Sequence, residues 1–166
     1  MNKSFLLAAA LFGSAVAAPA FAASALTEKN LSLEYAEQLA QKAIESCSAK
    51  NYSVAVTVVD RGGVIKVLKR MDNAGPHTVE ASRMKAFTAL STKSVTGDVM
   101  KNAQENAGAQ NLRDIPGFLL LAGGVPVKVD NQTIGAIGIG GAPGGHLDQQ
   151  CATEALEATK SLLNAS

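Results

Sequence analysis

The stretch "GFLLLAGGVPVKVDNQTIGAIGIGG", residues 117–141, decides the fold because it contains a hairpin marked by its own turn. Asp130 and Asn131 form a two-residue turn, which is a common connection between antiparallel strands. The residues after this turn predict one strand, and those before it predict one or two strands, interrupted by a Gly-Gly pair. An antiparallel sheet is therefore the first expectation.

A second hairpin lies nearer the N-terminus. The segment "YSVAVTVVD", residues 52–60, is rich in β-branched side chains and predicts a strand. "RGG" then supplies a turn, and "VIKVLKR", residues 64–70, predicts the return strand.

Helical segments surround and separate the two hairpins. Apolar residues recur at steps of three and four between Leu33 and Cys47, as in an amphipathic helix. Residues 78–93 predict a second helix, and residues 94–114 predict a short helix within a long excursion. Asp148 can cap a final helix. Helices that alternate with hairpins must cover the sheet, so the fold class is α+β in a single domain.

The first 22 residues predict a secretory signal peptide. Lys3 precedes an apolar run, and Ala20-Phe21-Ala22 has the small-x-small form of a cleavage site, so we expect cleavage after Ala22. A membrane anchor is the alternative, but the run is about fourteen residues and a span takes roughly 20. Residues 23–166 are then one exported domain, periplasmic or secreted, with no membrane span.

The charge balance argues against a nucleic-acid partner. Without Lys3, the 15 basic residues become 14, equal to the 14 acidic residues. Nucleic-acid binding needs a basic stripe that neutralises phosphates. The two cysteines, Cys47 and Cys151, could form a disulfide in an exported chain or remain as two buried thiols.

The glycine-rich stretch "GIGGAPGG", residues 138–145, does not match a dinucleotide-binding fingerprint, because Pro143 occupies the position of the third glycine. Its backbone N–H groups could hold a carboxylate or phosphate at a helix start. Alternatively, the stretch is only a tight turn from strand to helix.

The two histidines each lie where a loop meets a predicted helix. His77 follows the Gly-Pro kink in "GPHT", and His146 follows the glycine-rich stretch. Imidazole is a common ligand of transition metals and of haem iron. The alternative for His77 is an ordinary solvated side chain. The two histidines could converge if the sheet brings these ends together.

Three blocks of this chain resemble the GlcG/HbpS family, also called the domain of unknown function 336 or haem-degrading domain. They are "SVAVTVVDRGGVIKVLKRMD", "PHTVEASRMKAFTAL" and "GGVPVKVDNQTIGAIGIGGAPGGHLDQQCA". The resemblance covers about residues 31–163 and extends to the C-terminal domain of PduO proteins. It implies a profilin-like fold, with a five-stranded antiparallel sheet and helices on both faces. It also implies a homo-oligomer, and haem binding in the secreted members. Family members often carry an acidic residue where this chain has His146.

These observations predict an exported protein that binds haem or another tetrapyrrole, with a role in haem sensing, handling or degradation. His77 is the expected iron ligand, Arg70 and Lys85 would attract the propionates, and Met71 would contact the ring. The full set of candidate binding residues is His77, Arg70, Met71, Thr78, Glu80, Lys85, Gly140, Gly141 and His146.

Two other functions remain open from the sequence. The chain could be a small enzyme that acts on an organic acid or on haem, with His77 as general base and the amides of the glycine-rich stretch stabilising an anion. It could also be an assembly domain whose glycines serve packing alone.

Overall fold

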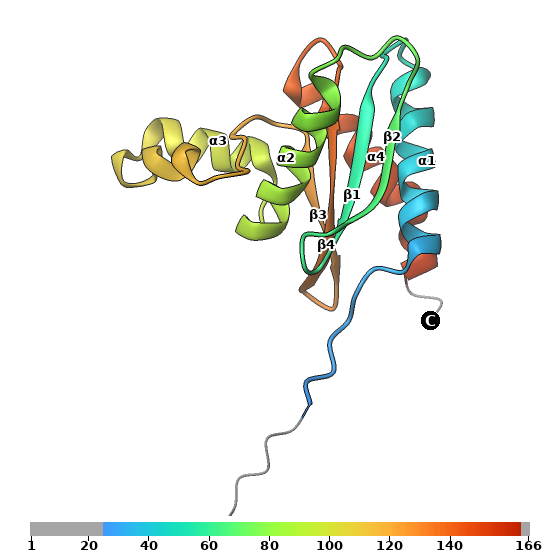
Figure 1. Ribbon diagram of the computed structural model, residues 1–166, viewed down its shortest axis with the longest axis horizontal. Coiled ribbons are helices and arrows are strands. Elements are labelled where there is room, and N and C mark those ends of the chain that lie inside the picture. The colour runs from blue at the N-terminus through green and yellow to red at the C-terminus, as the bar shows by residue number, and fades with distance from the viewer. Residues whose placement is uncertain (1–24, 164–166) are drawn as a thin grey trace, which may run out of the picture.

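The computed structural model of the protein describes residues 25–163, so the predicted signal peptide lies outside the described residues. The chain forms an antiparallel sheet with helices on both faces (Figure 1). The elements in chain order are α1 (Leu33–Ser48), β1 (Ala55–Asp60), β2 (Ile65–Arg70), α2 (Thr78–Thr92), α3 (Thr96–Glu105), the 3₁₀ helix η1 (Ala107–Asp114), β3 (Gly124–Val129), β4 (Gln132–Gly140) and α4 (Gly145–Leu163).

Both predicted hairpins are confirmed. The strand order is β2-β1-β4-β3, and each neighbouring pair is antiparallel. Asp130 and Asn131 both have positive φ, 49° and 62°, as a tight hairpin turn with the twist of the strands requires.

The described sheet has four strands, so the five implied by the family resemblance are wrong for residues 25–163. The residues before the second turn supply only one strand, β3, which begins at Gly124. Gly117 and Gly123 have φ values of +86° and +128°, so the backbone leaves the extended conformation at both ends of the apolar run between them.

Side chains alternate between the two faces of the sheet. On one face, Val56, Val58, Ile137 and Ile139 join the main core with α1 and α4. On the other face α2 lies against β1 and β4, where a smaller apolar cluster includes Ala136. The sheet is therefore covered by helices on both faces.

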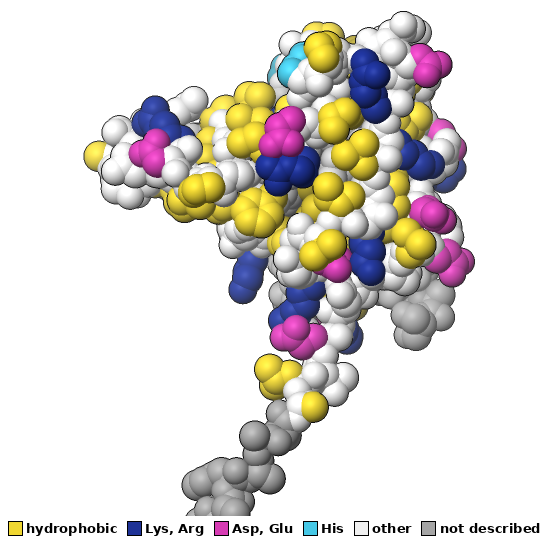
Figure 2. Space-filling view, in the orientation of Figure 1, with side chains coloured by type: hydrophobic (Ala, Val, Ile, Leu, Met, Phe, Trp, Pro, Cys, Tyr) yellow, Lys and Arg dark blue, Asp and Glu magenta, His cyan; other side chains and the backbone are white. Residues whose placement is uncertain are grey.

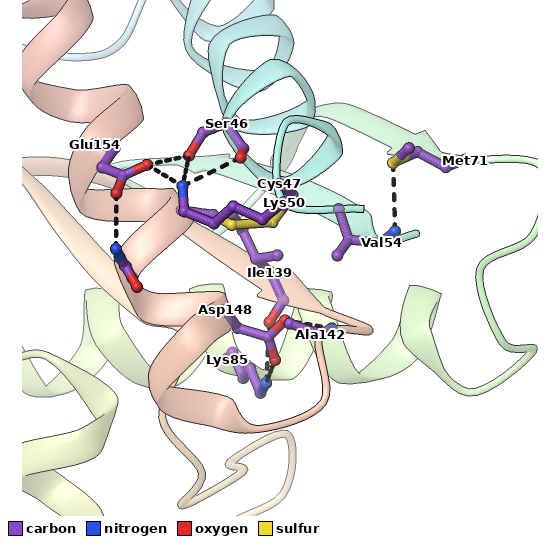
Figure 3. Close-up of a disulfide and its surroundings, with 12 residues drawn as sticks. Ser46, Cys47, Lys50, Val54, Met71, Lys85, Ile139, Ala142, Asp148 and Glu154 are labelled. Atoms are coloured by element: carbon purple, nitrogen blue, oxygen red, sulfur yellow. Dashed lines mark hydrogen bonds and ion pairs between the residues drawn. A yellow bond between two sulfur atoms is a disulfide. The ribbon is translucent and has the colours of Figure 1, made fainter. Parts of the chain in front are cut away.

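A disulfide joins Cys47 of α1 to Cys151 of α4, with the two Cα atoms 5.4 Å apart (Figure 3). Both side chains are fully buried. This confirms the disulfide among the two alternatives for the cysteines. The bridge fixes the first helix to the last beneath the sheet.

The predicted excursion forms α3 and η1, which project from the body of the domain (Figure 1). None of the helices in the described part of the chain is long and apolar enough to span a bilayer.

Candidate functional site

The two histidines mark the starts of two helices at one end of the domain. His77 is the residue before α2, and His146 lies in the first turn of α4. The loop that leads into α4 meets the start of α2, because a Cβ added at Gly141 would lie 3.3 Å from Thr78 Cγ2. Histidine reaches the surface at this end (Figure 2). Helix N-termini carry partial positive charge, so this end favours anionic groups.

Backbone contacts order the loop between β2 and α2. The Arg70 guanidinium donates to the carbonyl of Ala74, whose amide in turn donates to the carbonyl of Met71 at 3.0 Å. The Thr78 amide and hydroxyl both donate to the Gly75 carbonyl, at 3.1 and 2.7 Å. These bonds define the direction in which the chain enters α2.

The His77 side chain is exposed and projects beside Gly75, where an added Cβ would lie 3.0 Å from His77 Cε1. Its imidazole makes no cap bond to α2, and no side-chain hydrogen bond of His77 occurs among residues 25–163. Both ring nitrogens are therefore available to a ligand.

Met71 lies beneath the loop and is half-buried against the main core. Its Sδ accepts from the Val54 amide at 3.4 Å. Gly141 approaches the same segment: with φ of +129°, an added Cβ would lie 2.5 Å from the Ser53 carbonyl oxygen. Met71, Thr78 and Gly141 are thus brought together around the start of β1, as the candidate set requires.

Lys85 lies in a different environment from the one that the sequence suggested. It is 2% exposed, and its ammonium donates to Asp148 Oδ2 at 2.7 Å and to the Ile139 carbonyl at 2.9 Å (Figure 3). A propionate could reach Lys85 only if this ion pair opened. The predicted propionate contact of Lys85 stays untested.

Asp148 differs from its predicted role as the cap of the last helix. The helix begins three residues earlier, at Gly145, so Asp148 lies within the first turn. Its Oδ1 accepts from the Ala142 amide at 2.9 Å. Burial raises the pKa of Asp148, while Lys85, the Ala142 amide and His146 act in the opposite direction.

Glu80 is paired within its own helix. Arg83 donates to both of its carboxylate oxygens, at 2.9 and 2.6 Å. The hydrogen bonds from Arg83 lower the pKa of Glu80. Glu80 therefore contributes little free negative charge to the site. Gly140 packs below the first turn of α2, where an added Cβ would lie 3.2 Å from the Thr78 carbonyl oxygen.

Two cavities lie at the opposite end of the domain. One, of about 770 Å³, is formed by the start of α1, the β3–β4 turn and the end of α4. The other, of about 500 Å³, lies between the β1–β2 turn and the end of α2. Sequence reasoning missed both, because their walls come from turns that carry no recognisable ligand motif.

The described structure defines a small α+β domain with an antiparallel sheet, helices on both faces and a histidine at the start of each of two helices. The family described as "Haem degrading protein HbpS-like" matches residues 31–157, and the chain belongs to this family. The resemblance noted in the three sequence blocks is confirmed.

Relatives support this assignment. Protein GlcG of Escherichia coli (strain K12) is 36% identical over 115 residues, which cover 68% of this chain and 83% of GlcG. A double mutant of Streptomyces reticuli HbpS is 38% identical, with a TM-score of 0.76 over 88% of this chain and 97% of that one. A structure described as a PduOC:heme complex is 28% identical, with a TM-score of 0.71 over 77% of this chain and 94% of that one.

Proposed function

We propose that this chain is an exported haem-binding protein and that His77 ligates the iron. The HbpS-like family and the PduOC:heme complex support a role in haem binding or handling. The observation that carries the proposal is the exposed His77 imidazole, which makes no side-chain hydrogen bond among the described residues. It directly precedes Thr78, which lies against Gly141 of the glycine-rich stretch.

The residues at this end fit haem better than a bare metal ion. Nowhere in residues 25–163 do three or more His, Cys, Asp or Glu side chains gather in a way that could hold a metal. Haem iron already has four porphyrin nitrogens, so a single imidazole can serve as its axial ligand. Arg70 and the start of α2 would attract the propionates, and Met71 would offer a polarisable contact.

A hemin titration of the mature protein, followed by the Soret band, tests the proposal. His77→Ala should weaken binding about tenfold or more and shift the band, because an axial ligand is lost. Free imidazole should restore the wild-type spectrum. His146→Ala tests the other histidine of the candidate set, and a larger loss there than in His77→Ala would make His146 the ligand. An unchanged spectrum and affinity in His77→Ala would place the ligand elsewhere.

Haem binding and haem degradation are separated by adding a reductant to the loaded protein in air-saturated buffer, because opening the porphyrin ring consumes O2 as well as electrons. A stable, reduced Soret spectrum supports binding or handling. Loss of the band with release of iron and a linear tetrapyrrole would make the chain an enzyme, and His77→Ala would then have to be tested for turnover.

Export is the second part of the proposal. The features that support it are the predicted signal sequence and the disulfide, since such bonds persist in oxidising compartments. The protein recovered from a periplasmic or secreted fraction should have the intact mass of a chain that starts at Ala23, less two hydrogens for the disulfide. Full-length chain in the cytoplasmic fraction would contradict export.

A homo-oligomer remains a prediction. Val64, Ile65 and Leu68 lie at the β2 edge and are 64%, 42% and 40% exposed. Exposed apolar side chains in one neighbourhood are typical of contact surfaces. Light scattering of the mature protein with and without hemin checks this, because a monomer in both states would exclude a binding site shared between copies.

A further inference from the structure

The pair formed by Lys85 and Asp148 is a buried ion pair that joins separate parts of the fold. Lys85 lies in α2 and Asp148 in the first turn of α4, and their side chains are 2% and 4% exposed. The Lys85 ammonium also donates to the Ile139 carbonyl in β4. One lysine side chain thereby connects a helix on one face of the sheet to a helix on the other.

The carboxylate of Asp148 also holds the glycine-rich stretch. One oxygen accepts a hydrogen bond from the Lys85 ammonium, and the other accepts one from the Ala142 amide at 2.9 Å (Figure 3). The backbone at Gly123 packs directly against this ion pair: a Cβ added there would lie 2.8 Å from both Lys85 Nζ and Asp148 Cβ. The segment that follows β4 is therefore anchored from inside the protein.

Stability alone is a weak reason for such a pair. Removing two charges from water costs much of what their attraction returns, and apolar residues of similar volume often replace a buried ion pair without loss of stability. The pair does something that apolar residues cannot do, because it supplies an acceptor for the Ala142 amide. Residues 143–145 lead directly from that anchor to His146, and Gly141, just before the anchor, lies against Thr78 at the start of α2.

We propose that Lys85 and Asp148 are positioning residues, which fix residues 141–145 in the conformation that binds the ligand. This inference rests on the proposed haem site, and it assigns a function to two residues that need not touch the ligand. For ligand binding, the required group is the Asp148 oxygen that accepts from the Ala142 amide. Lys85 orients this carboxylate and balances its negative charge.

Two double variants separate positioning from stability. K85M/D148L replaces the pair with apolar side chains and removes the acceptor for Ala142. K85M/D148N also removes both charges, but its amide oxygen can still accept from Ala142. Glu154→Gln is the matched control, because it breaks the exposed Lys50–Glu154 pair between α1 and α4, away from the glycine-rich stretch.

We expect K85M/D148L to unfold cooperatively but to bind hemin about tenfold more weakly than wild type. K85M/D148N should restore the affinity to within about threefold, and Glu154→Gln should leave it unchanged. Equal hemin affinity in K85M/D148L and wild type would overturn the inference. If K85M/D148L does not fold, K85M/D148A removes the same acceptor with less bulk and provides the same comparison.

Amide exchange of Ala142 gives a readout that does not require hemin. The amide should exchange slowly in wild type and K85M/D148N, and about tenfold or more faster in K85M/D148L. If wild type binds no hemin, the proposed function fails while this exchange pattern still tests the positioning. Equal exchange in all three proteins would contradict the positioning itself.

Discussion

Gly138 determines how closely α2 can approach the sheet. A Cβ added there would lie 2.1 Å from the Ser82 carbonyl oxygen and 2.5 Å from the Ala86 amide nitrogen. Both atoms belong to the helix backbone, so a side chain at this position must push the whole helix outward. Glycine is required here because the α2 backbone packs so closely against the sheet. Backbone conformation is not the reason, since φ of Gly138 is not in the left-handed region.

Gly138→Ala should therefore destabilise the protein by about 1 to 3 kcal/mol, the usual cost of overpacking a core. Gly62→Ala is the control, because its added Cβ would meet only Asp60 Oδ1 at 3.4 Å, an ordinary contact. Urea unfolding followed by circular dichroism measures both. Equal unfolding midpoints would show that α2 can move without cost.

For single residues, the sequence predicted where a candidate residue lies in the fold better than it predicted the partners of its side chain. The predicted β1–β2 hairpin brings Met71 to the Val54 amide. Gly141 reaches Thr78 through the pairing of β1 with β4, which the hairpin pattern did not predict. Lys85 was expected to attract a propionate, but its side chain is paired with Asp148, 63 residues further on. A partner that far along the chain leaves no local signal, so sequence reasoning missed the buried pair.

Among the elements, α1 and α4 are joined covalently by a disulfide. The disulfide closes a loop with a sequence separation of 104 residues. In the chain-entropy model, such a cross-link stabilises a protein by limiting the conformations of the unfolded chain. Side-chain contacts also join these helices: a hydrogen bond between Tyr35 and Thr159, one from Ser46 to Glu154, and the ion pair of Lys50, just after α1, with Glu154.

Cys47→Ala/Cys151→Ala should lower the free energy of unfolding by about 3 to 5 kcal/mol, as expected for a loop of this length. Urea titrations of wild type with and without a reductant give the same comparison without a mutation. The reductant should leave the double variant unchanged. If the reduced and oxidised proteins have the same midpoint, the bridge does not restrict the unfolded chain as proposed.

Most helices and strands could be predicted from the sequence, because each depends on a pattern of neighbouring residues. The α1 pattern of apolar residues and the Asp130-Asn131 turn both depend on neighbouring residues. The number of strands in the sheet could not be predicted from the sequence. The apolar run before Gly123 has the composition of a strand, but the backbone geometry at its glycines keeps it outside the sheet.

Across the whole molecule, the two ends of the sheet offer different kinds of site. One end has two helix starts, two histidines and the glycine-rich stretch held by Asp148. The other end has the two cavities, whose volumes of about 770 and 500 Å³ fall within the usual range for small-molecule sites. The proposed function places haem at the first end, and volume alone would favour the second.

Hydrogen–deuterium exchange of the mature protein, with and without hemin, decides between the two ends directly. Bound ligand should slow exchange in the backbone that it contacts or orders. The account predicts slower exchange in peptides that cover residues 71–79 and 140–147, and loss of that protection in His77→Ala. Protection confined to residues 29–35 and 129–134, retained in His77→Ala, would contradict it and place the ligand in the larger cavity.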